Sequence, residues 1–140
     1  MIRVYVDMVA DLFHVGHLNL IKKAKECGDY LIVGIHSDLD VESYKRKPII
    51  SEEDRYEIIS SCKFIDRVIR AAPLKITRKF IDENDIDIVI HGDDKNPVYK
   101  EQYKIPAELG IMRYLPYTKG ISTTEIIKRI KEKLKSDSRA

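Results

Sequence analysis

Short apolar runs rich in β-formers alternate along the chain with longer segments whose apolar residues recur at helical spacing. Tyr30–Ile35 is almost continuously apolar, which is typical of a parallel strand covered on both faces. The predicted strands are Ile2–Val6, Tyr30–Ile35, Asp66–Ile69, Ile86–Ile90 and Ile111–Leu115. The predicted helices are His17–Cys27, Ser51–Cys62, Ile76–Asn84, part of Pro97–Leu109 with a break at Pro106, and Ser122–Lys135, while Val41–Ile50 is predicted to be a polar loop.

This alternation predicts an α/β fold: an open, mostly parallel five-stranded sheet with helices on both faces. We expect one domain over residues 1–135 and a frayed tail over residues 136–140. The last helix carries Ile126, Ile127, Ile130 and Leu134 on one face, which we expect to pack on the sheet. Ligands of such sheets bind at the carboxyl ends of the strands, where the strand order reverses.

Composition narrows the class of protein. The 140 residues are 44% hydrophobic and 34% charged, as in globular proteins, and 25 basic against 23 acidic residues are too balanced to suggest nucleic-acid binding. Cys27 and Cys62 are expected to be buried, reduced thiols, which favours a reducing cytoplasm. No apolar run approaches the roughly 20 residues of a membrane span, and a secretory signal peptide is not expected.

The stretch "HVGH" places His14 and His17 around Gly16, between a predicted strand and a predicted helix. Unpaired backbone N–H groups at a helix start attract anions, and two imidazoles add donors, so a phosphate chain would fit there. Metal ligands and ordinary surface histidines are the alternatives. Zinc is disfavoured because no third and fourth ligand follows at suitable spacing.

The stretch "GISTTEII" gives Ser122 and Glu125 the spacing of a capping box. It is either a good helix cap alone or also a second helix start that presents the hydroxyls of Ser122 and Thr123 to phosphate. These two interpretations are compatible.

Two further segments carry charge. "SYKRKPI" holds Lys45, either in a solvated basic loop or in a lid over a phosphate. Arg55 follows on a helix, where it would either reach a carboxylate or a phosphate or, more simply, form a surface ion pair. "HGDD" ends in Asp93 and Asp94, which would bind Mg²⁺, accept hydrogen bonds from an amino group such as that of a cytosine, or belong to a simple turn. Neither a P-loop nor a GxGxxG motif is present.

Taken in order, these motifs resemble the cytidylyltransferase family of the HxGH nucleotidyltransferases. "HVGH" fits HxGH and "GISTTEII" resembles the RTEGIST signature. Between them, "YLIVGIHSD", "RYEIISSCKFIDRVIRAAP" and "IDIVIHGDD" look like the catalytic domains of choline-phosphate, ethanolamine-phosphate and glycerol-3-phosphate cytidylyltransferases. The likeness runs from about Val4 to Ile130 and implies a Rossmann-like nucleotidyltransferase fold.

The resemblance implies transfer of CMP from CTP to a small phosphoalcohol, giving a CDP-alcohol and pyrophosphate. It implies that His14 and His17 stabilise the transition state and that Lys45 bridges the reacting phosphates. Mg²⁺ would travel on the CTP phosphates without a protein ligand. The implied nucleotide-binding positions are Val9, Ala10, Asp11, Gly16, Arg55, Gly92, Asp94, Tyr117, Lys119, Gly120, Ile121, Ser122 and Thr123. The resemblance also implies a second copy as a partner in a homodimer. From composition and hydropathy, neither nucleic acid nor a membrane span is expected.

The chain departs from the family pattern at several positions. Met8 replaces the glycine before HxGH, and Tyr117 replaces the arginine of RTEGIST, whose charge Lys119 would partly restore. Tyr99 and Lys63 match acceptor-pocket positions of the family, while Leu74 stands where an aromatic residue is expected. The acceptor therefore stays open between phosphocholine, phosphoethanolamine, glycerol phosphate and a phosphonate.

Two other functions remain open from the sequence. One is an adenylyltransferase of the same superfamily that uses ATP. The other is a nucleotide-binding protein without catalysis, which the substitutions at Met8 and Tyr117 would allow.

Overall fold

A five-stranded, all-parallel sheet forms the centre of the computed structural model, which describes residues 1–93 and 96–138. Its strand order is β3-β2-β1-β4-β5, so the order reverses beside β1, which pairs with β2 on one side and β4 on the other. The strands are β1 (Arg3–Met8), β2 (Tyr30–Ile35), β3 (Arg67–Arg70), β4 (Ile88–Gly92) and β5 (Met112–Leu115).

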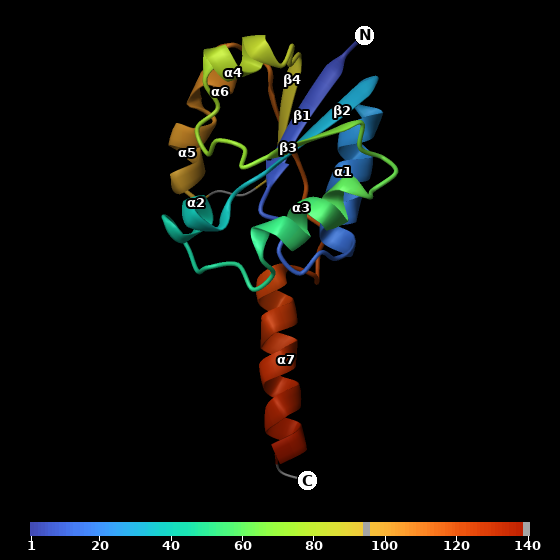
Figure 1. Cartoon of the computed structure of the whole chain (residues 1–140), viewed down its shortest axis with the longest axis vertical. Coiled ribbons are helices and arrows are strands. Elements are labelled where there is room, and N and C mark those ends of the chain that lie inside the picture. Colours follow the sequence, from blue (N-terminus) through green and yellow to red (C-terminus); the bar gives the residue numbers. More distant parts are fainter. Residues whose placement is uncertain (94–95, 139–140) are drawn as a thin grey trace.

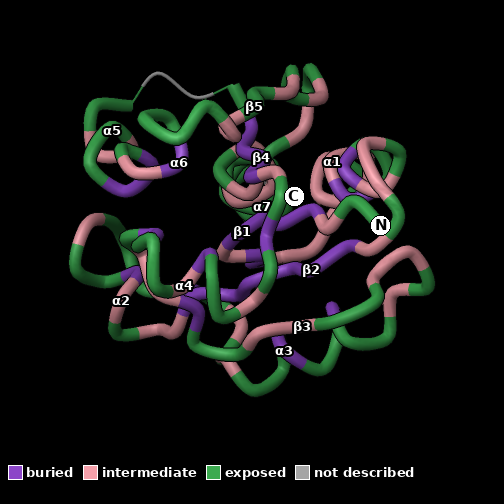
Figure 2. The backbone as a smooth tube through the Cα atoms, turned by 90° about the horizontal axis from the view of Figure 1, so that it is seen from above, coloured by how far each residue is buried: buried purple, intermediate pink, exposed green. Residues whose placement is uncertain are grey.

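Helices cover both faces of the sheet (Figures 1 and 2). Alternate residues of the central strands point to opposite faces. Val4 and Val6 pack in one core cluster with the helices at residues 15–26 and 52–60, whereas Tyr5 packs in the other with the helices at residues 78–83 and 104–108. The described helices are α1 (Val15–Glu26), α2 (Asp38–Glu42), α3 (Glu52–Ser60), α4 (Arg78–Glu83), α5 (Val98–Gln102), α6 (Lys104–Glu108) and α7 (Thr123–Ser138). The predicted two-sided α/β architecture is confirmed.

Several element boundaries differ from the sequence prediction. The first strand continues through Asp7 to Met8, and β4 includes His91 and Gly92. The polar residues Asp7 and His91 therefore lie within strands rather than after them. Helix α1 begins at Val15, two residues early, because His14 caps it. The expected polar loop is interrupted at its start by the end of α2.

The predicted break at Pro106 is wrong in position. Pro106 is the third residue of α6, and the chain breaks earlier, at Tyr103. A proline is tolerated in the first turn of a helix, where its missing N–H has no intrahelical partner to lose. The Gln102 carbonyl, four residues before the proline, instead accepts from Ile76 N at 3.1 Å.

The last helix also departs from expectation. Helix α7 projects away from the sheet instead of packing on it (Figure 1). Ile126 and Ile127 are half-buried at its root, but Ile130 is 49% and Leu134 64% exposed. The expected burial of this apolar face is therefore wrong for this chain, because no strand or helix of the described residues lies beside its outer part.

The two cysteines are free and half-buried, less enclosed than expected. Both pack against the core cluster that includes α1 and α3. Within the described residues, no helix has the length and apolar character needed to cross a membrane.

Candidate active site

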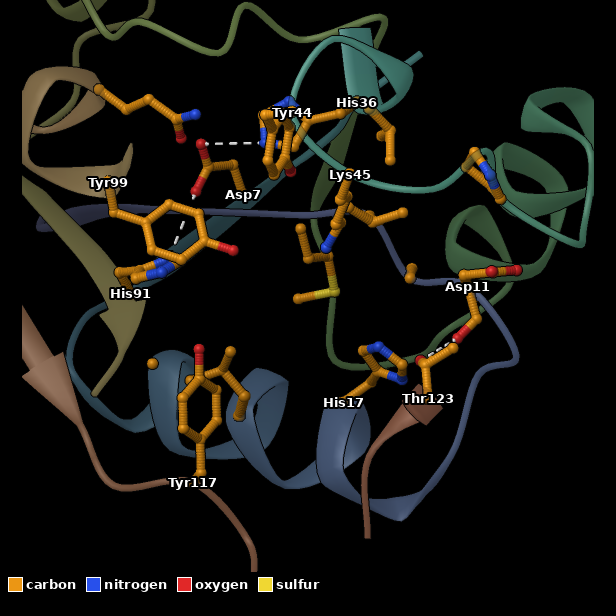
Figure 3. Close-up of a pocket in the computed structure, with 18 of the residues that line it drawn as sticks. Asp7, Asp11, His17, His36, Tyr44, Lys45, His91, Tyr99, Tyr117 and Thr123 are labelled. Atoms are coloured by element: carbon orange, nitrogen blue, oxygen red, sulfur yellow. Dashed lines mark hydrogen bonds and ion pairs between the residues drawn. The ribbon is translucent and has the colours of Figure 1, made fainter. Parts of the chain in front are cut away.

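A pocket of about 170 Å³ lies at the carboxyl ends of β1 and β4, where the strand order reverses (Figure 3). This is the position at which open parallel sheets bind ligands. Its lining residues are Asp7, Met8, Val9, Ala10, Asp11, His17, Leu20, His36, Val41, Tyr44, Lys45, Arg46, Pro48, His91, Gly92, Tyr99, Gln102, Tyr103, Tyr117 and Thr123.

The loop between β1 and α1 forms one wall of the pocket. Ala10 and Leu12 adopt positive φ angles of 58° and 49°, a conformation that non-glycine residues rarely take. Such strain persists only where surrounding contacts hold it. The buried Asp11 supplies these contacts: its carboxylate accepts from Ile49 N and Ile50 N at 2.9 Å each, and its carbonyl accepts from Thr123 Oγ1 at 2.7 Å. Asp11 thus ties this loop to the lysine-bearing connection and to the start of α7.

The two histidines cap α1 reciprocally. His14 Nδ1 accepts from Gly16 N at 2.9 Å, and His17 Nδ1 accepts from His14 N at 3.2 Å. Because both Nδ1 atoms are acceptors, each neutral ring carries its proton on Nε2 and can donate it. The ring centroids are 3.9 Å apart, and His17 lines the pocket.

Gly16 is required by this arrangement. A Cβ atom at this position would lie 2.7 Å from His14 Cε1, closer than real Cβ contacts allow. The spacing predicted an anion site, and the structure adds the reciprocal caps that orient both imidazoles.

Burial keeps both imidazoles neutral. Burial lowers the pKa of His14 below its usual value. The pKa of His17 is lowered to about 3, mainly by burial. The charges of His14 and Lys45 lower it too, whereas the carboxylate of Asp11 acts in the opposite direction. At neutral pH the site therefore presents neutral Nε2–H donors rather than imidazolium ions.

The remaining phosphate-site candidates come from two other elements. Lys45 lines the pocket, and its Nζ lies 5.4 Å from the centroid of the Tyr44 ring. Thr123 also lines it, at the first turn of α7. Ser122 is exposed, and its Oγ accepts from Glu125 N at 3.0 Å, so the capping interpretation is confirmed. Ser122 does not line the pocket.

Arg55 has a supporting position behind the pocket. Its side chain is fully buried rather than on the helix surface. It donates to the carbonyls of Val9 at 2.6 Å and His36 at 2.9 Å, and it pairs with Asp38 at 2.7 Å. The resemblance implied that Arg55 binds the nucleotide, but Arg55 does not line the pocket. Arg55 fixes the backbone ends of β1 and β2 that carry the wall.

A buried polar network that the sequence did not predict forms the floor of the pocket. Asp7 Oδ1 accepts from Tyr103 Oη at 2.5 Å, Tyr103 Oη lies 2.9 Å from His91 Nδ1, and Asp7 Oδ2 lies 3.3 Å from His36 Nε2. His36 Nδ1 donates to the Ala72 carbonyl at 3.1 Å, since a carbonyl can only accept. Figure 3 shows Asp7 between His36 and the His91 side of the pocket.

Charge within this network follows from its contacts. Burial lowers the pKa of His36, but the hydrogen bond and charge of Asp7 more than offset it, so the pKa is raised. Burial and Asp7 raise the pKa of Tyr103 well above its usual value, so its hydroxyl stays protonated. The sequence held one signal for this network: Asp7 and His91 are polar residues inside otherwise apolar strands.

The two acceptor-site candidates separate in space. Tyr99 lines the pocket, with its ring centroid 4.7 Å from that of His91 and 6.4 Å from that of Tyr44. Lys63 does not reach it. Lys63 precedes β3 at the amino ends of the strands, the edge opposite the pocket, and its Nζ lies 5.3 Å from the centroid of the Phe64 ring. The expectation for Lys63 is not supported by this placement.

The segment before α7 closes another side. Tyr117 lines the pocket beside Gly92, where a Cβ atom would come within 2.2 Å of Tyr117 Cε1, so only glycine allows this approach. Gly120 has a φ of 81°, which favours glycine. Lys119, Gly120 and Ile121 lie outside the pocket lining. The Asp94 candidate lies outside the described residues.

The carboxylates that line the described part of the pocket belong to Asp7 and Asp11. Within residues 1–93 and 96–138, no three or more acidic, histidine or cysteine side chains cluster so as to hold a metal ion. The pocket carboxylates of Asp7 and Asp11 already accept hydrogen bonds from Tyr103 and from backbone amides.

Curated proteins are similar to this chain in sequence. An ethanolamine-phosphate cytidylyltransferase from Dictyostelium discoideum is 42% identical over 133 residues, covering 91% of this chain and 37% of the relative. Choline-phosphate cytidylyltransferase A from Homo sapiens is 38% identical over 133 residues, covering 92% of this chain and 36% of the relative. The chain thus spans well under half the length of these curated relatives.

Solved structures agree on the fold. A protein from Thermoplasma volcanium, described as a lipopolysaccharide core biosynthesis protein, is 32% identical with a TM-score of 0.68, covering 86% of this chain and 99% of that one. A pantothenate synthetase from Thermus thermophilus shares the fold alone, at 13% identity and a TM-score of 0.53, covering 83% of this chain and 56% of that one. The cytidylyltransferase-like family model matches residues 9–129, and the resemblance read from the sequence is confirmed: the chain belongs to the cytidylyltransferase-like family.

Proposed function

We propose that this protein is a CTP-dependent cytidylyltransferase that transfers CMP to a small phosphoalcohol, giving a CDP-alcohol and pyrophosphate. The observation that carries the proposal is the orientation of His14 and His17. Their Nδ1 atoms are occupied by backbone N–H groups, so their Nε2–H groups remain as donors at the strand-order reversal of a cytidylyltransferase-like fold.

The proposed reaction needs positioning and charge stabilisation rather than a protein nucleophile. An oxygen of the acceptor phosphate attacks the α-phosphorus of CTP in line. The bond from the α-phosphorus to the bridging oxygen breaks, and pyrophosphate leaves with that electron pair. CTP enters as its magnesium complex. The Nε2–H groups of His14 and His17 and the ammonium of Lys45 stabilise charge on the transferring phosphoryl oxygens.

The two substrates divide the pocket between them in this proposal. Thr123 and the start of α7 take the outer phosphates, and Gly92 and Tyr117 border the nucleoside. The acceptor occupies the side lined by Asp7, Tyr44 and Tyr99. Named relatives act on ethanolamine phosphate and choline phosphate, and both belong in the acceptor panel with glycerol 3-phosphate and a phosphonate.

The test is pyrophosphate release, measured with each nucleoside triphosphate against that panel of acceptors. Release that requires CTP and one phosphoalcohol supports the proposal. A preference for ATP would identify an adenylyltransferase instead. No release with any pair, despite nucleotide binding in calorimetry, would identify a nucleotide-binding protein without catalysis.

Lys119 is proposed to supply part of the phosphate-binding charge that Tyr117 lacks. It is exposed two residues beyond Tyr117, in the turn that leads to α7. The variant Lys119→Ala should raise the KM for CTP, with Lys128→Ala on α7 as the matched control. An unchanged KM for CTP would remove Lys119 from the site.

We further propose that the protein works in the cytoplasm as a homodimer. The free state of Cys27 and Cys62 fits a reducing compartment.

A further inference from the structure

Helix α7 leaves the domain with an apolar stripe facing no other element of the described chain. At 16 residues it is about 24 Å long. Ile130 and Leu134 are 49% and 64% exposed on this stripe. At helical spacing Lys131 and Lys133 lie on its two sides, so the stripe has basic flanks.

An open groove with complementary character lies beside α3. Ile49, Ile50 and Ile58 supply its apolar part, and Ile49 and Ile58 are 59% and 42% exposed. Asp54 and Glu57, both exposed, line it as well. Its apolar surface with acidic side chains matches the apolar stripe and basic flanks of α7.

The groove adjoins the root of α7 within one chain. Asp11 accepts from Ile49 N and Ile50 N through its carboxylate and from Thr123 Oγ1 through its carbonyl. Figure 1 shows the connection before α3 descending to the start of α7, whose outer part points away. The helix therefore cannot fold back into its own adjoining groove.

We propose that α7 docks its Ile130–Leu134 stripe into the Ile49–Ile58 groove of a second copy, reciprocally in a two-fold dimer. This surface deepens the proposed homodimer. In such a dimer each copy inserts its α7 into the groove of the other. The stripe and the groove are then both buried, and the basic side chains of α7 lie against the acidic side chains of the groove.

The first test is the mass of the full chain by sedimentation velocity across micromolar concentrations. Wild type is expected to be a dimer. Leu134→Glu and Ile58→Glu, both at exposed positions, should each raise the dimer dissociation constant at least about tenfold. A dimer unaffected by either variant would overturn the docking while leaving the homodimer intact. A monomeric wild type would overturn both but not the transfer reaction.

Charge reversal provides a sharper test. Lys131→Glu with Lys133→Glu on α7, or Asp54→Lys with Glu57→Lys in the groove, should each weaken self-association. Mixing the two reversed chains should restore dimers, because each helix then meets a groove of opposite charge. Glu26→Lys with Glu108→Lys, at exposed positions on α1 and α6, is the matched control and should leave the dimer unchanged. Failure of the mixed chains to associate would contradict the docking.

A basic amphipathic helix is also suited to an anionic membrane surface. Flotation with phosphatidylglycerol vesicles separates this outcome. A monomer that floats with vesicles, and loses this property in Leu134→Glu, would overturn docking to a second copy.

Discussion

At the scale of single residues, the chemistry of the site depends on which ring nitrogens of the two histidines accept hydrogen bonds from the backbone. The caps of α1 use Nδ1 of His14 and His17, which turns the protonated Nε2 atoms outward. Burial then keeps these imidazoles neutral, so in the proposed reaction they would donate hydrogen bonds to phosphate oxygens while Lys45 would supply the positive charge. Residue type gave the chemistry, and local hydrogen bonding selected the tautomer.

Replacement of His17 by alanine tests this donor. His17→Ala should lower kcat by roughly a hundredfold or more, as removal of one preorganised transition-state donor does in other enzymes. The measurement is steady-state pyrophosphate release with CTP in excess, alongside circular dichroism to verify folding. His36→Ala would not serve as a control, because His36 lines the same pocket; Lys128→Ala on α7 does. Near-normal turnover in His17→Ala would remove this histidine from the mechanism.

The lowered pKa of His17 also predicts a pH dependence of stability. Between pH 6.5 and about 3 the unfolded chain binds a proton at this position that the folded chain does not. Stability from this residue is therefore present above pH 6.5 and lost as the pH falls. Relative to His17→Asn, the wild type should lose about 2 kcal/mol of unfolding free energy between pH 7 and pH 5.

Urea unfolding of both proteins at each pH measures this difference. The raised pKa of His36 acts in the opposite direction, since its contribution is lost as the pH rises through that pKa. The two proteins share that contribution, so the difference between them isolates His17. Parallel stability curves would show that His17 is not desolvated in the folded state.

At the scale of elements, α3 supports the pocket through one buried arginine. Arg55 binds the carbonyls of Val9, His36 and Ile50 at the carboxyl ends of β1 and β2 and at the start of α3. Through this one side chain, α3 fixes the ends of two strands and the connection that carries Lys45. The surface ion pair expected from the sequence is instead a buried clamp.

Loss of this clamp should be costly. Arg55→Ala removes the ion-pair partner of Asp38 and the donor to three carbonyls, and removal of one partner of a buried pair costs about 3–5 kcal/mol. Calorimetric or urea unfolding checks the value. Glu53→Ala on the same helix is the matched control, since its pair with Arg70 is exposed and contributes about 1 kcal/mol at most. Equal effects of the two substitutions would contradict the clamp.

At the scale of the whole molecule, contacts between distant segments close the pocket. Tyr103 reaches Asp7 across 96 positions of sequence, and Thr123 reaches Asp11 across 112. The first strand, the break between α5 and α6, and the start of α7 therefore meet at one edge of the sheet.

Tyr103→Phe tests this long-range closure. It removes one donor from the buried Asp7, which should destabilise the fold by about 1–3 kcal/mol and raise the KM for the acceptor more than the KM for CTP. Tyr114→Phe on β5, where the ring is exposed, is the control. Equal changes in both KM values would show that the network supports the pocket generally rather than its acceptor side.

The sequence by itself determined the alternation of strands and helices, the edge of the sheet that holds the site, and the motifs around His14 and Ser122. These follow from periodicity and from capping chemistry, which act over a few neighbouring residues. Only the tertiary structure decided the burial of Arg55, the network around Asp7, the position of Lys63 at the opposite edge, and the outward direction of α7. Each of these depends on which distant segments pack together, and neither spacing nor residue type encodes that.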